Sequence, residues 1–251
     1  MQKEEETRQG AHYDRLAARY EASYGDRWSR QYRHRFVHGP MTAGVPLEGA
    51  NILEAMCGSG QLAEYLVAHG AKVTGIDVAP AEIELFRNRV PGHTALVGSI
   101  LDTGLPSEAF DAVMVVGALH HVQPYVEQAV DEIHRLLRPG GFFCFLEPHV
   151  GSLPNAIRRL WYRLDPLFEE NEAAVDVDRL MDRNRHRFEF VTTSYTGGLA
   201  FLLVYNSLVF RVPTRLKQLY ASMLLWLEGL LGRVQTKRTS CIVICQWLKR
   251  P

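Results

Sequence analysis

Short apolar runs and amphipathic segments alternate along residues 51–147. A run such as Phe110–Val116 is continuously apolar, as expected of a strand that is buried on both faces of a sheet. Between the runs, apolar residues recur at every third or fourth position, which predicts amphipathic helices. The expected strands are residues 51–54, 72–77, 94–98, 110–116 and 142–146, and the expected helices are residues 61–69, 80–90 and 124–137. Repeated β–α units of this length predict a mostly parallel sheet with right-handed crossovers.

The alternation changes after residue 147. The expected elements are helices at 154–168 and 176–184, a strand at 187–193, two apolar helical segments at 199–210 and 215–231 separated by Pro213, and a final strand at 240–248. The helices between the last two strands are expected to form a cap at one end of the sheet. The predicted fold is α/β, a Rossmann-like, doubly wound, seven-stranded and mostly parallel sheet with an N-terminal helical lid and a C-terminal helical cap.

The N-terminal segment predicts a helix from Ala11 that is broken at Gly25, followed by a second helical piece to about Val37. One face of the first helix carries Tyr13, Leu16, Ala17, Tyr20 and Tyr24. Such a stripe is typical of a buried face, and it is also suited to a lid over a ligand. Residues 38–50 contain glycine and proline and are expected to be a linker.

The chain is therefore expected to have three parts. Residues 1–50 form the lid and linker, residues 51–150 form the cofactor-binding core, and residues 151–251 form the cap together with the last two strands of the same sheet. A chain of 251 residues is long enough for one large α/β domain.

Charge and cysteine content narrow the possible partners. Lys and Arg total 28, equal to Asp and Glu, so no overall field favours nucleic acid. Residues 1–150 carry 13 basic and 19 acidic side chains, whereas residues 151–251 carry 15 and 9. Four cysteines without CxxC spacing indicate buried thiols in a reducing cytoplasm. The polar N-terminus shows no secretory signal, and no apolar run is long enough to predict a transmembrane span.

The stretch Asn51–Gly60 is the clearest sign of a ligand site. It runs from an apolar strand through a glycine-containing turn into a helix, and Gly58 and Gly60 lack the Cβ that would keep a ligand away from the backbone. The next strand ends in Asp77, where an acid can accept hydrogen bonds from ribose hydroxyls.

Four stretches together resemble the class I S-adenosylmethionine-dependent methyltransferases, and most closely the small-molecule group that includes the ubiquinone and menaquinone C-methyltransferases. The stretches are residues 53–60, 73–77, 110–122 and 136–142. The Tyr13–Tyr20 segment resembles the N-terminal lid of that group. The resemblance covers residues 11–147 and the final strand, and it implies S-adenosylmethionine as cofactor and S-adenosylhomocysteine as product.

The resemblance also implies roles for individual residues. Glu54 would lie beneath the methionine moiety, Asp77 would bind the ribose diol, and Gly117 would pass close to the sulfonium. The implied cofactor-binding residues are Tyr13, Glu54, Ala55, Met56, Cys57, Gly58, Gly60, Asp77, Val78, Ser99, Ile100 and Gly117, with Val78, Ser99 and Ile100 around the adenine.

The sequence departs from the family pattern at two of these positions. Met56 replaces the first glycine of the usual Glu-x-Gly-x-Gly-x-Gly, and we expect an ordinary φ there because a bulky residue at positive φ is unfavourable. Ser99 stands where an acid often receives the adenine amino group, which would change adenine recognition.

Two histidines are candidates for a general base. His120 and His121 follow the strand 110–116 at the carboxyl end of the sheet, and neutral imidazole can deprotonate a phenol, enol or hydroxyl. A structural role for either histidine is the alternative, and the sequence does not choose between them. Glu147 and His149 face the same rim and are weaker candidates. The histidines show no clustering that would indicate a metal site.

The acceptor is expected to be a small, hydrophobic molecule methylated on oxygen or carbon. The end of strand 110–116 lacks the Asn/Asp-Pro-Pro-Tyr-like sequence of amino-methylating nucleic-acid enzymes, although the Arg-rich and aromatic stretch 158–163 keeps a nucleic-acid acceptor as an alternative. The apolar segments 199–210 and 215–231 suit either a buried cap or a surface lying on lipid, with Arg211, Arg215 and Lys217 near headgroups. The expected location is therefore cytoplasmic, with peripheral membrane contact as the second possibility.

Two other functions fit parts of the sequence. A nicotinamide-dependent oxidoreductase fits the glycine turn but not the Gly-x-Gly-x-x-Gly pattern. A cofactor-binding or membrane-docked protein without activity would have the same fold, since a fold alone does not determine function.

Overall fold

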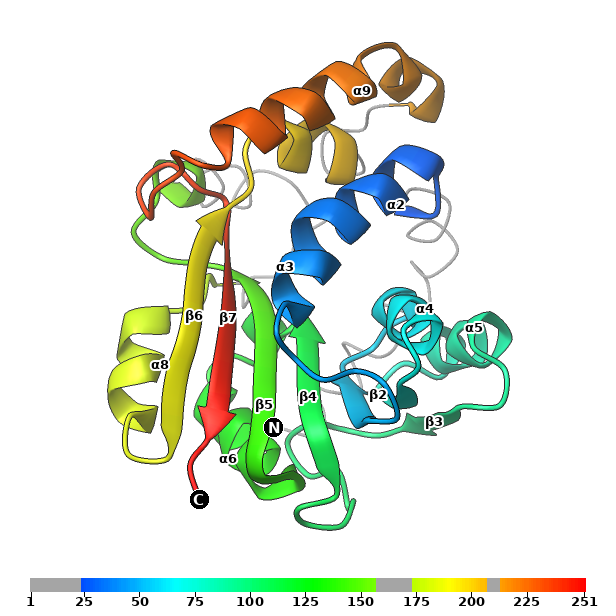
Figure 1. Cartoon of the computed structure of the whole chain (residues 1–251), viewed down its shortest axis with the longest axis vertical. Coiled ribbons are helices and arrows are strands. Elements are labelled where there is room, and N and C mark those ends of the chain that lie inside the picture. Colours follow the sequence, from blue (N-terminus) through cyan, green and yellow to red (C-terminus); the bar gives the residue numbers. More distant parts are fainter. Residues whose placement is uncertain (1–23, 157–172, 207–212) are drawn as a thin grey trace.

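The computed structural model of the chain describes residues 24–156, 173–206 and 213–251, and they contain a seven-stranded sheet. The strands are β1 Asn51–Ala55, β2 Lys72–Asp77, β3 Thr94–Val97, β4 Phe110–Val116, β5 Leu137–Pro148, β6 Phe188–Thr196 and β7 Ile242–Lys249. Their order is β3-β2-β1-β4-β5-β7-β6, and only β7 runs antiparallel to its neighbours (Figure 1). The predicted α/β class and mostly parallel seven-stranded sheet are confirmed.

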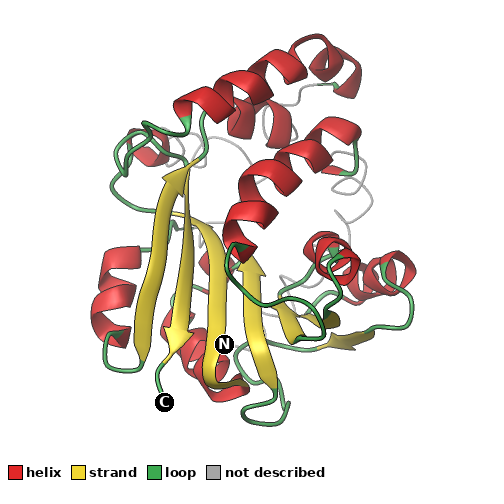
Figure 2. Ribbon diagram, viewed as in Figure 1, coloured by secondary structure: helices red, strands yellow, loops and turns green. Residues whose placement is uncertain are grey.

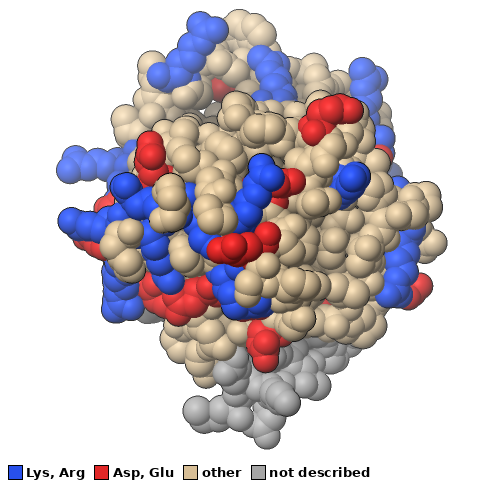
Figure 3. Space-filling model, turned by 60° about the horizontal axis from the view of Figure 1, so that its bottom comes forward, with Lys and Arg blue, Asp and Glu red and all other residues tan. Residues whose placement is uncertain are grey.

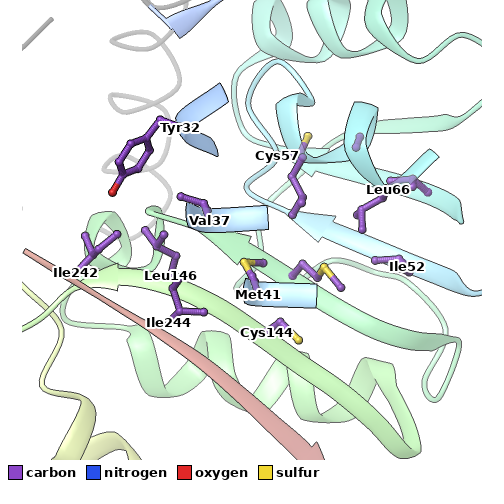
Figure 4. Packing of buried hydrophobic residues seen from close by; sticks show 14 of the residues in the cluster. Tyr32, Val37, Met41, Ile52, Cys57, Leu66, Cys144, Leu146, Ile242 and Ile244 are labelled. Carbon is purple, nitrogen blue, oxygen red and sulfur yellow. The ribbon is translucent and has the colours of Figure 1, made fainter. Parts of the chain in front are cut away.

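Helices cover both faces of the sheet (Figure 2). The described helices are α2 Arg27–Arg33, η1 His34–His38, α3 Gly39–Thr42, α4 Gln61–Ala68, α5 Pro80–Arg89, η2 Leu119–Val122, α6 Val126–Leu136, α8 Val177–Asn184, η3 Phe201–Tyr205 and α9 Thr214–Leu231. One core cluster joins α3, α4 and α5 to the sheet, and a second joins α6 and α8 to its other face. Figure 4 shows Met41 of α3, Leu66 of α4 and Cys144 of β5 in the first of these clusters.

The local sequence explains most of these elements. The apolar positions of α6 recur at helical spacing and are all buried, as the pattern predicted. Asp176 caps α8 by accepting a hydrogen bond from the Arg179 N–H at 3.1 Å. Every strand expected from the sequence is present, and the bounds of β2 and β4 are those predicted.

Several element boundaries differ from the prediction, two of them by about five residues. Residues 39–42, expected to belong to the linker, form α3, because Pro40 is at the start of the helix, where its missing N–H breaks no hydrogen bond. Strand β5 begins at Leu137 rather than at residue 142, because Leu137 pairs with Phe110 across a register shift in β4. The expected helix over residues 11–24 and the stretch 158–163 lie almost wholly outside the described residues.

The described cap helices α2 and α9 lie side by side, above the end of the sheet to which β4 points (Figure 1). Lys217 of α9 reaches α2, where its Nζ lies 2.6 Å from Asp26 Oδ2 and 2.9 Å from Ser29 Oγ. Its side chain is 1% exposed, so the expectation that Lys217 lies near lipid headgroups is wrong. The division of the chain into parts at residues 50 and 150 stays a prediction.

The opposite end of the sheet carries charges of both signs (Figure 3). Arg138 pairs with Asp111, and Arg135 pairs with Glu132 at 2.7 Å. The arginines of both pairs are partly exposed, so each pair contributes little stability. They do show that basic and acidic side chains neutralise each other at this end.

Candidate active site

The turn between β1 and α4 has an unusual backbone. The φ angles of Met56, Gly58 and Gly60 are 55°, 48° and 75°. The expectation of an ordinary φ at Met56 is therefore wrong. The Cys57 N–H donates to the Ile76 carbonyl at 3.1 Å and the Gly58 N–H to Asp77 Oδ2 at 2.9 Å, so β2 holds the turn in a shape that positions Met56 in the left-handed region. For a residue with a Cβ this conformation costs roughly 1–2 kcal/mol.

The glycines around this turn serve two purposes. A Cβ on Gly60 would lie 2.5 Å from the ring of Phe86, so the absence of a side chain there allows α5 to pack against α4. By contrast, a Cβ on Gly58 would meet no atom closer than 3.7 Å, and one on Gly117 none closer than 4.0 Å. A Cβ would therefore fit without a clash at Gly58 and Gly117, so these two positive-φ positions leave room for a ligand that approaches the backbone.

Glu54 lies under the turn. It is 4% exposed, and its Oε2 accepts the Ala63 N–H, in the first turn of α4, at 2.8 Å. Burial raises the pKa of Glu54 to about 8, although the backbone hydrogen bonds lower it. Glu54 therefore caps the N-terminus of α4 in this structure, which fixes the helix relative to the turn.

Asp77 joins three loops at the carboxyl end of the sheet. Its Oδ1 accepts the Ala79 N–H and its Oδ2 the Gly58 N–H, both at 2.9 Å. Its backbone carbonyl accepts the N–H of Gly98, at the start of the loop after β3. The structure thus brings Asp77, the residue predicted to bind the ribose, next to the glycine turn.

The predicted adenine-side residues follow in the neighbouring loops. Val78 is half-buried and Ile100 is 2% exposed. The Ser99 Oγ accepts the Leu101 N–H at 3.0 Å, so this hydroxyl orders its own loop. Ala55 and Cys57 are buried within the core around the turn. Tyr13 lies outside the described residues.

A histidine–carboxylate pair lies at the end of β4. His120 Nδ1 is 2.8 Å from Glu147 Oε2, and both residues are buried. Glu147 Oε1 accepts the N–H groups of Ala118 and Leu119 at 2.8 and 2.7 Å, so the carboxylate also orders the loop that carries the histidine. With Nδ1–H donated to the carboxylate, Nε2 is the ring nitrogen that can accept a proton.

Burial raises the pKa of Glu147 to about 7, while the N–H groups of Leu119 and Ala118 lower it. The pKa of Glu147 is higher in the folded than in the unfolded chain, so protonation of this carboxyl stabilises the folded chain. This contribution is fully present below about pH 4.5. It is lost as the pH rises through about 7. The ionised pair that orients His120 thus forms near neutral pH.

The other candidate bases are placed differently. The His121 ring centroid lies 3.9 Å from that of His120, and a charge on His121 lowers the pKa of Glu147. His149 Nε2 lies 2.9 Å from Ser240 Oγ and its ring is buried, so it ties β5 to the start of β7. The prediction from the sequence was that Glu147 is a weaker candidate base, and it did not pair Glu147 with His120. Within the described residues, no group of three or more His, Cys, Asp or Glu could hold a metal ion.

We predict that Met56→Gly raises the free energy of unfolding by about 1 kcal/mol, because glycine adopts the left-handed conformation without strain. Urea unfolding measures this change. The matched control is Glu108→Gly, since Glu108 has nearly the same φ of 56° and belongs to no predicted site. A destabilised Met56→Gly variant would show that the packing of the methionine against the core outweighs the strain relief.

Comparisons with known proteins agree with this geometry. Residues 53–145 match the model of a methyltransferase domain family. An uncharacterized methyltransferase from Synechocystis is 33% identical over 112 residues, covering 42% of this chain and 53% of the relative. The phthiotriol/phenolphthiotriol dimycocerosates methyltransferase of Mycobacterium tuberculosis is 36% identical over 121 residues, covering 47% and 43%. The chain matches only about half the length of these curated relatives.

Solved structures share the fold over nearly the whole chain. A SAM-dependent methyltransferase from Thermotoga maritima superposes with a TM-score of 0.67 at 17% identity, covering 96% of this chain and 99% of that one. The [4+2]-cyclase SpnF superposes with a TM-score of 0.64 at 15% identity, covering 98% and 97%. At these identities the likeness shows the fold alone. Together with the domain match, it confirms the resemblance to the class I S-adenosylmethionine-dependent methyltransferases, a family that implies a cofactor of the S-adenosylmethionine type.

Proposed function

We propose that this chain, a member of the class I S-adenosylmethionine-dependent methyltransferases, transfers a methyl group to an oxygen of a small hydrophobic acceptor, with carbon as the alternative acceptor atom. The observation that carries this proposal is the buried pair of His120 and Glu147, at the carboxyl end of β4 and three residues from Gly117. Ligands bind at this end of the strands in open α/β sheets.

The residues around the turn suit S-adenosylmethionine. The space beside Gly58 and Gly117, where a Cβ would fit without a clash, would admit the amino-carboxypropyl and sulfonium part. Asp77 would hold the ribose, and Val78 and Ile100 would flank the adenine with apolar surface. Tyr13, Glu54, Ala55, Met56, Cys57, Gly60 and Ser99 complete the proposed cofactor-binding set. When bound, S-adenosylmethionine supplies an activated methyl group on a sulfonium.

His120 would remove the acceptor proton. His120 Nε2 would accept a hydrogen bond from the acceptor hydroxyl and take its proton, which would make the oxygen a nucleophile for the methyl group that the cofactor supplies. Glu147 holds the imidazole in the tautomer that leaves Nε2 basic, and stabilises the imidazolium that forms. The remaining contribution of the chain is positioning and exclusion of water.

Two observations support a hydrophobic acceptor. The described cap presents an aromatic cluster above the sheet, in which the Tyr32 and Tyr205 rings stack with centroids 5.4 Å apart. The Mycobacterium relatives are named for phthiotriol and phenolphthiotriol dimycocerosates, and a triol offers hydroxyl groups. The four cysteines are buried and form no disulfide in the described part of the chain, which supports the proposed cytoplasmic location.

We predict that Asp77→Ala weakens S-adenosylhomocysteine binding at least about tenfold, because hydrogen bonds to a charged group contribute roughly 1.5–3 kcal/mol. Titration calorimetry of wild type and variant with S-adenosylmethionine and S-adenosylhomocysteine measures the change. Glu84→Ala is the matched control, because Glu84 is an exposed carboxylate on the neighbouring helix α5.

Asp77 also orders the turn, so the melting temperature of each variant is measured alongside affinity. A lower melting temperature with unchanged affinity would show that Asp77 serves the loops and not the ligand. If wild type binds neither compound, the site is not a cofactor site.

If wild type binds the cofactor, acceptors are screened by transfer of labelled methyl. Faster turnover of polar than of apolar phenols and alcohols would contradict the proposal of a hydrophobic acceptor.

One observation keeps a second candidate function. The strained Met56 interrupts the usual glycine series at the cofactor turn, and a fold can bind a cofactor without transferring its methyl. In this second function the protein would be a cofactor-binding partner without turnover. Two results would support it: the protein binds the cofactor but methylates no acceptor, and replacing His120 leaves cofactor binding unchanged.

A further inference from the structure

Helix α9 has an apolar face on each side. Its inner face packs Ala221, Leu224 and Leu225 into the core. Its outer face is an exposed stripe of Leu216, Leu219, Met223, Trp226 and Leu230, spaced alternately three and four residues apart. Leu219 is 81% exposed and Trp226 64%. Because this spacing keeps all five side chains on one line, they form a continuous apolar surface. Figure 1 shows α9 as the outermost element of the cap.

The charge on α9 is one-sided. Its only acid is Glu228, and its exposed basic residues lie at or just beyond its ends. Glu228 is 3% exposed and accepts the N–H groups of Gly198 and Ala200, so it presents no charge to solvent. Arg215 in the first turn of α9 and Arg233 just beyond its end are both exposed. The opposite end of the sheet differs, because its ion pairs mix both signs (Figure 3).

We propose that the outer stripe of α9 docks on the surface of an anionic lipid bilayer. A helix that lies in the interface buries its apolar side chains at the level of the acyl boundary, while basic side chains at its ends attract anionic headgroups. Trp226 is central in the stripe, and tryptophan favours the membrane–water interface. Of the helices that the structure describes, none is both long and apolar enough to cross a membrane, so the contact is with one leaflet.

Charge favours a bilayer over a second copy of the chain. Two α9 helices packed antiparallel would place Arg215 of each beside Arg233 of the other, and parallel packing would pair like residues. Both arrangements bring cations together without an exposed acid on α9 to compensate. An anionic surface accepts both ends of the helix at once.

The test is sedimentation of the full chain with vesicles of equal parts phosphatidylcholine and phosphatidylglycerol. We expect binding to these vesicles, much weaker binding to pure phosphatidylcholine, and weakening with added salt. The double variant Leu219→Asp/Met223→Asp should lose at least about tenfold in partitioning, because both side chains would enter the acyl boundary as charges. Val191→Asp is the matched control, since Val191 is an exposed apolar residue on β6.

Each other outcome overturns the proposal. Equal binding by Leu219→Asp/Met223→Asp and wild type would show that α9 is not the docking surface. A wild type that fails to bind anionic vesicles but is a dimer by light scattering, and a monomer in the double variant, would identify a second copy as the occupant. The vesicle test needs neither cofactor nor turnover, so its result is independent of the proposed methyl transfer.

Discussion

Replacing His120 with alanine is expected to lower kcat for methyl transfer by about 10²–10⁴-fold, the usual contribution of a positioned general base. The ring lies at the carboxyl end of β4, and its Nδ1 is fixed by the buried Glu147. Cofactor affinity should stay within about twofold of wild type, because His120 belongs to no part of the proposed cofactor cradle. Single-turnover methyl transfer and titration calorimetry measure the two quantities separately.

Glu147→Gln tests how the pair works. The amide oxygen can still accept the N–H groups of Ala118 and Leu119, but its NH₂ would then face His120 Nδ1. That contact favours the tautomer with a proton on Nε2, which cannot act as a base. We therefore expect a loss of rate similar to that of His120→Ala, with the fold retained.

The pH profile gives a second readout. Because burial raises the pKa of Glu147 to about 7, the rate of wild type should rise as the pH passes through about 7 and the carboxyl ionises. The residual rate of Glu147→Gln should lack this rise. A Glu147→Gln variant with the wild-type profile would show that another group titrates.

His121→Ala is the control for both variants. It removes a neighbouring imidazole whose ring centroid lies 3.9 Å from that of His120, but leaves the hydrogen bond to Glu147 in place. We expect a loss of less than about tenfold, well below the range for a general base. A larger loss in His121→Ala than in His120→Ala would assign the base to His121.

The strands could be predicted from the sequence because they depend on local patterns, and the proposed cofactor site was placed by patterns of the same kind. The continuous apolar run of β4 and the acid at the end of β2 can be recognised without knowing which segments are neighbours. The pairing of His120 with Glu147 could not be recognised in this way. It depends on the register of β4 against β5, which places Val116 beside Leu146, and so brings together two residues that are 27 positions apart in the chain.

Met56 and Gly60 also depend on contacts that no local pattern reveals. The backbone of Met56 is fixed by β2, a strand that ends about twenty residues later, because the next two residues donate hydrogen bonds to Ile76 and Asp77. Gly60 looked like a contact for a ligand, but its missing side chain is needed by Phe86 of α5. A local rule predicts only that a glycine can adopt this backbone conformation. Whether its missing side chain makes room for a ligand or for a neighbouring side chain depends on the packing.

Lys217 is the position at which a local interpretation failed most clearly. One of the two interpretations of segment 215–231 placed this lysine near lipid headgroups, yet its side chain is 1% exposed and paired with Asp26. The partner lies 191 residues earlier in the chain, so no local pattern could have revealed it. This contact joins the helix before the core to the helix after it, and therefore holds the described part of the cap together.

Lys217→Met is expected to lower the free energy of unfolding by about 3 kcal/mol, because removing one partner of a buried ion pair leaves the other charge without compensation. Asp26 also caps α2 by accepting the Trp28 N–H at 2.9 Å, and Ser29 Oγ donates to its Oδ2 at 2.7 Å. The variant should therefore loosen the start of α2 as well as its contact with α9. Urea unfolding measures the loss, and Arg215→Met, on the exposed side of the same helix, should change stability by less than about 0.5 kcal/mol.

The loss should depend on pH in a defined direction. Burial would raise the pKa of Asp26, but the hydrogen bonds from Lys217 and Ser29 outweigh it and hold this pKa below 3.8. A lowered pKa stabilises the folded chain above pH 3.8, and this contribution is lost as the pH falls further. The difference between wild type and Lys217→Met should therefore shrink in acid. Asp26→Asn keeps an N-cap side chain, and combining it with Lys217→Met should cost less than the sum of the two single changes. Additive losses would show that the two side chains stabilise the cap independently, and that the ion pair does not join α2 to α9.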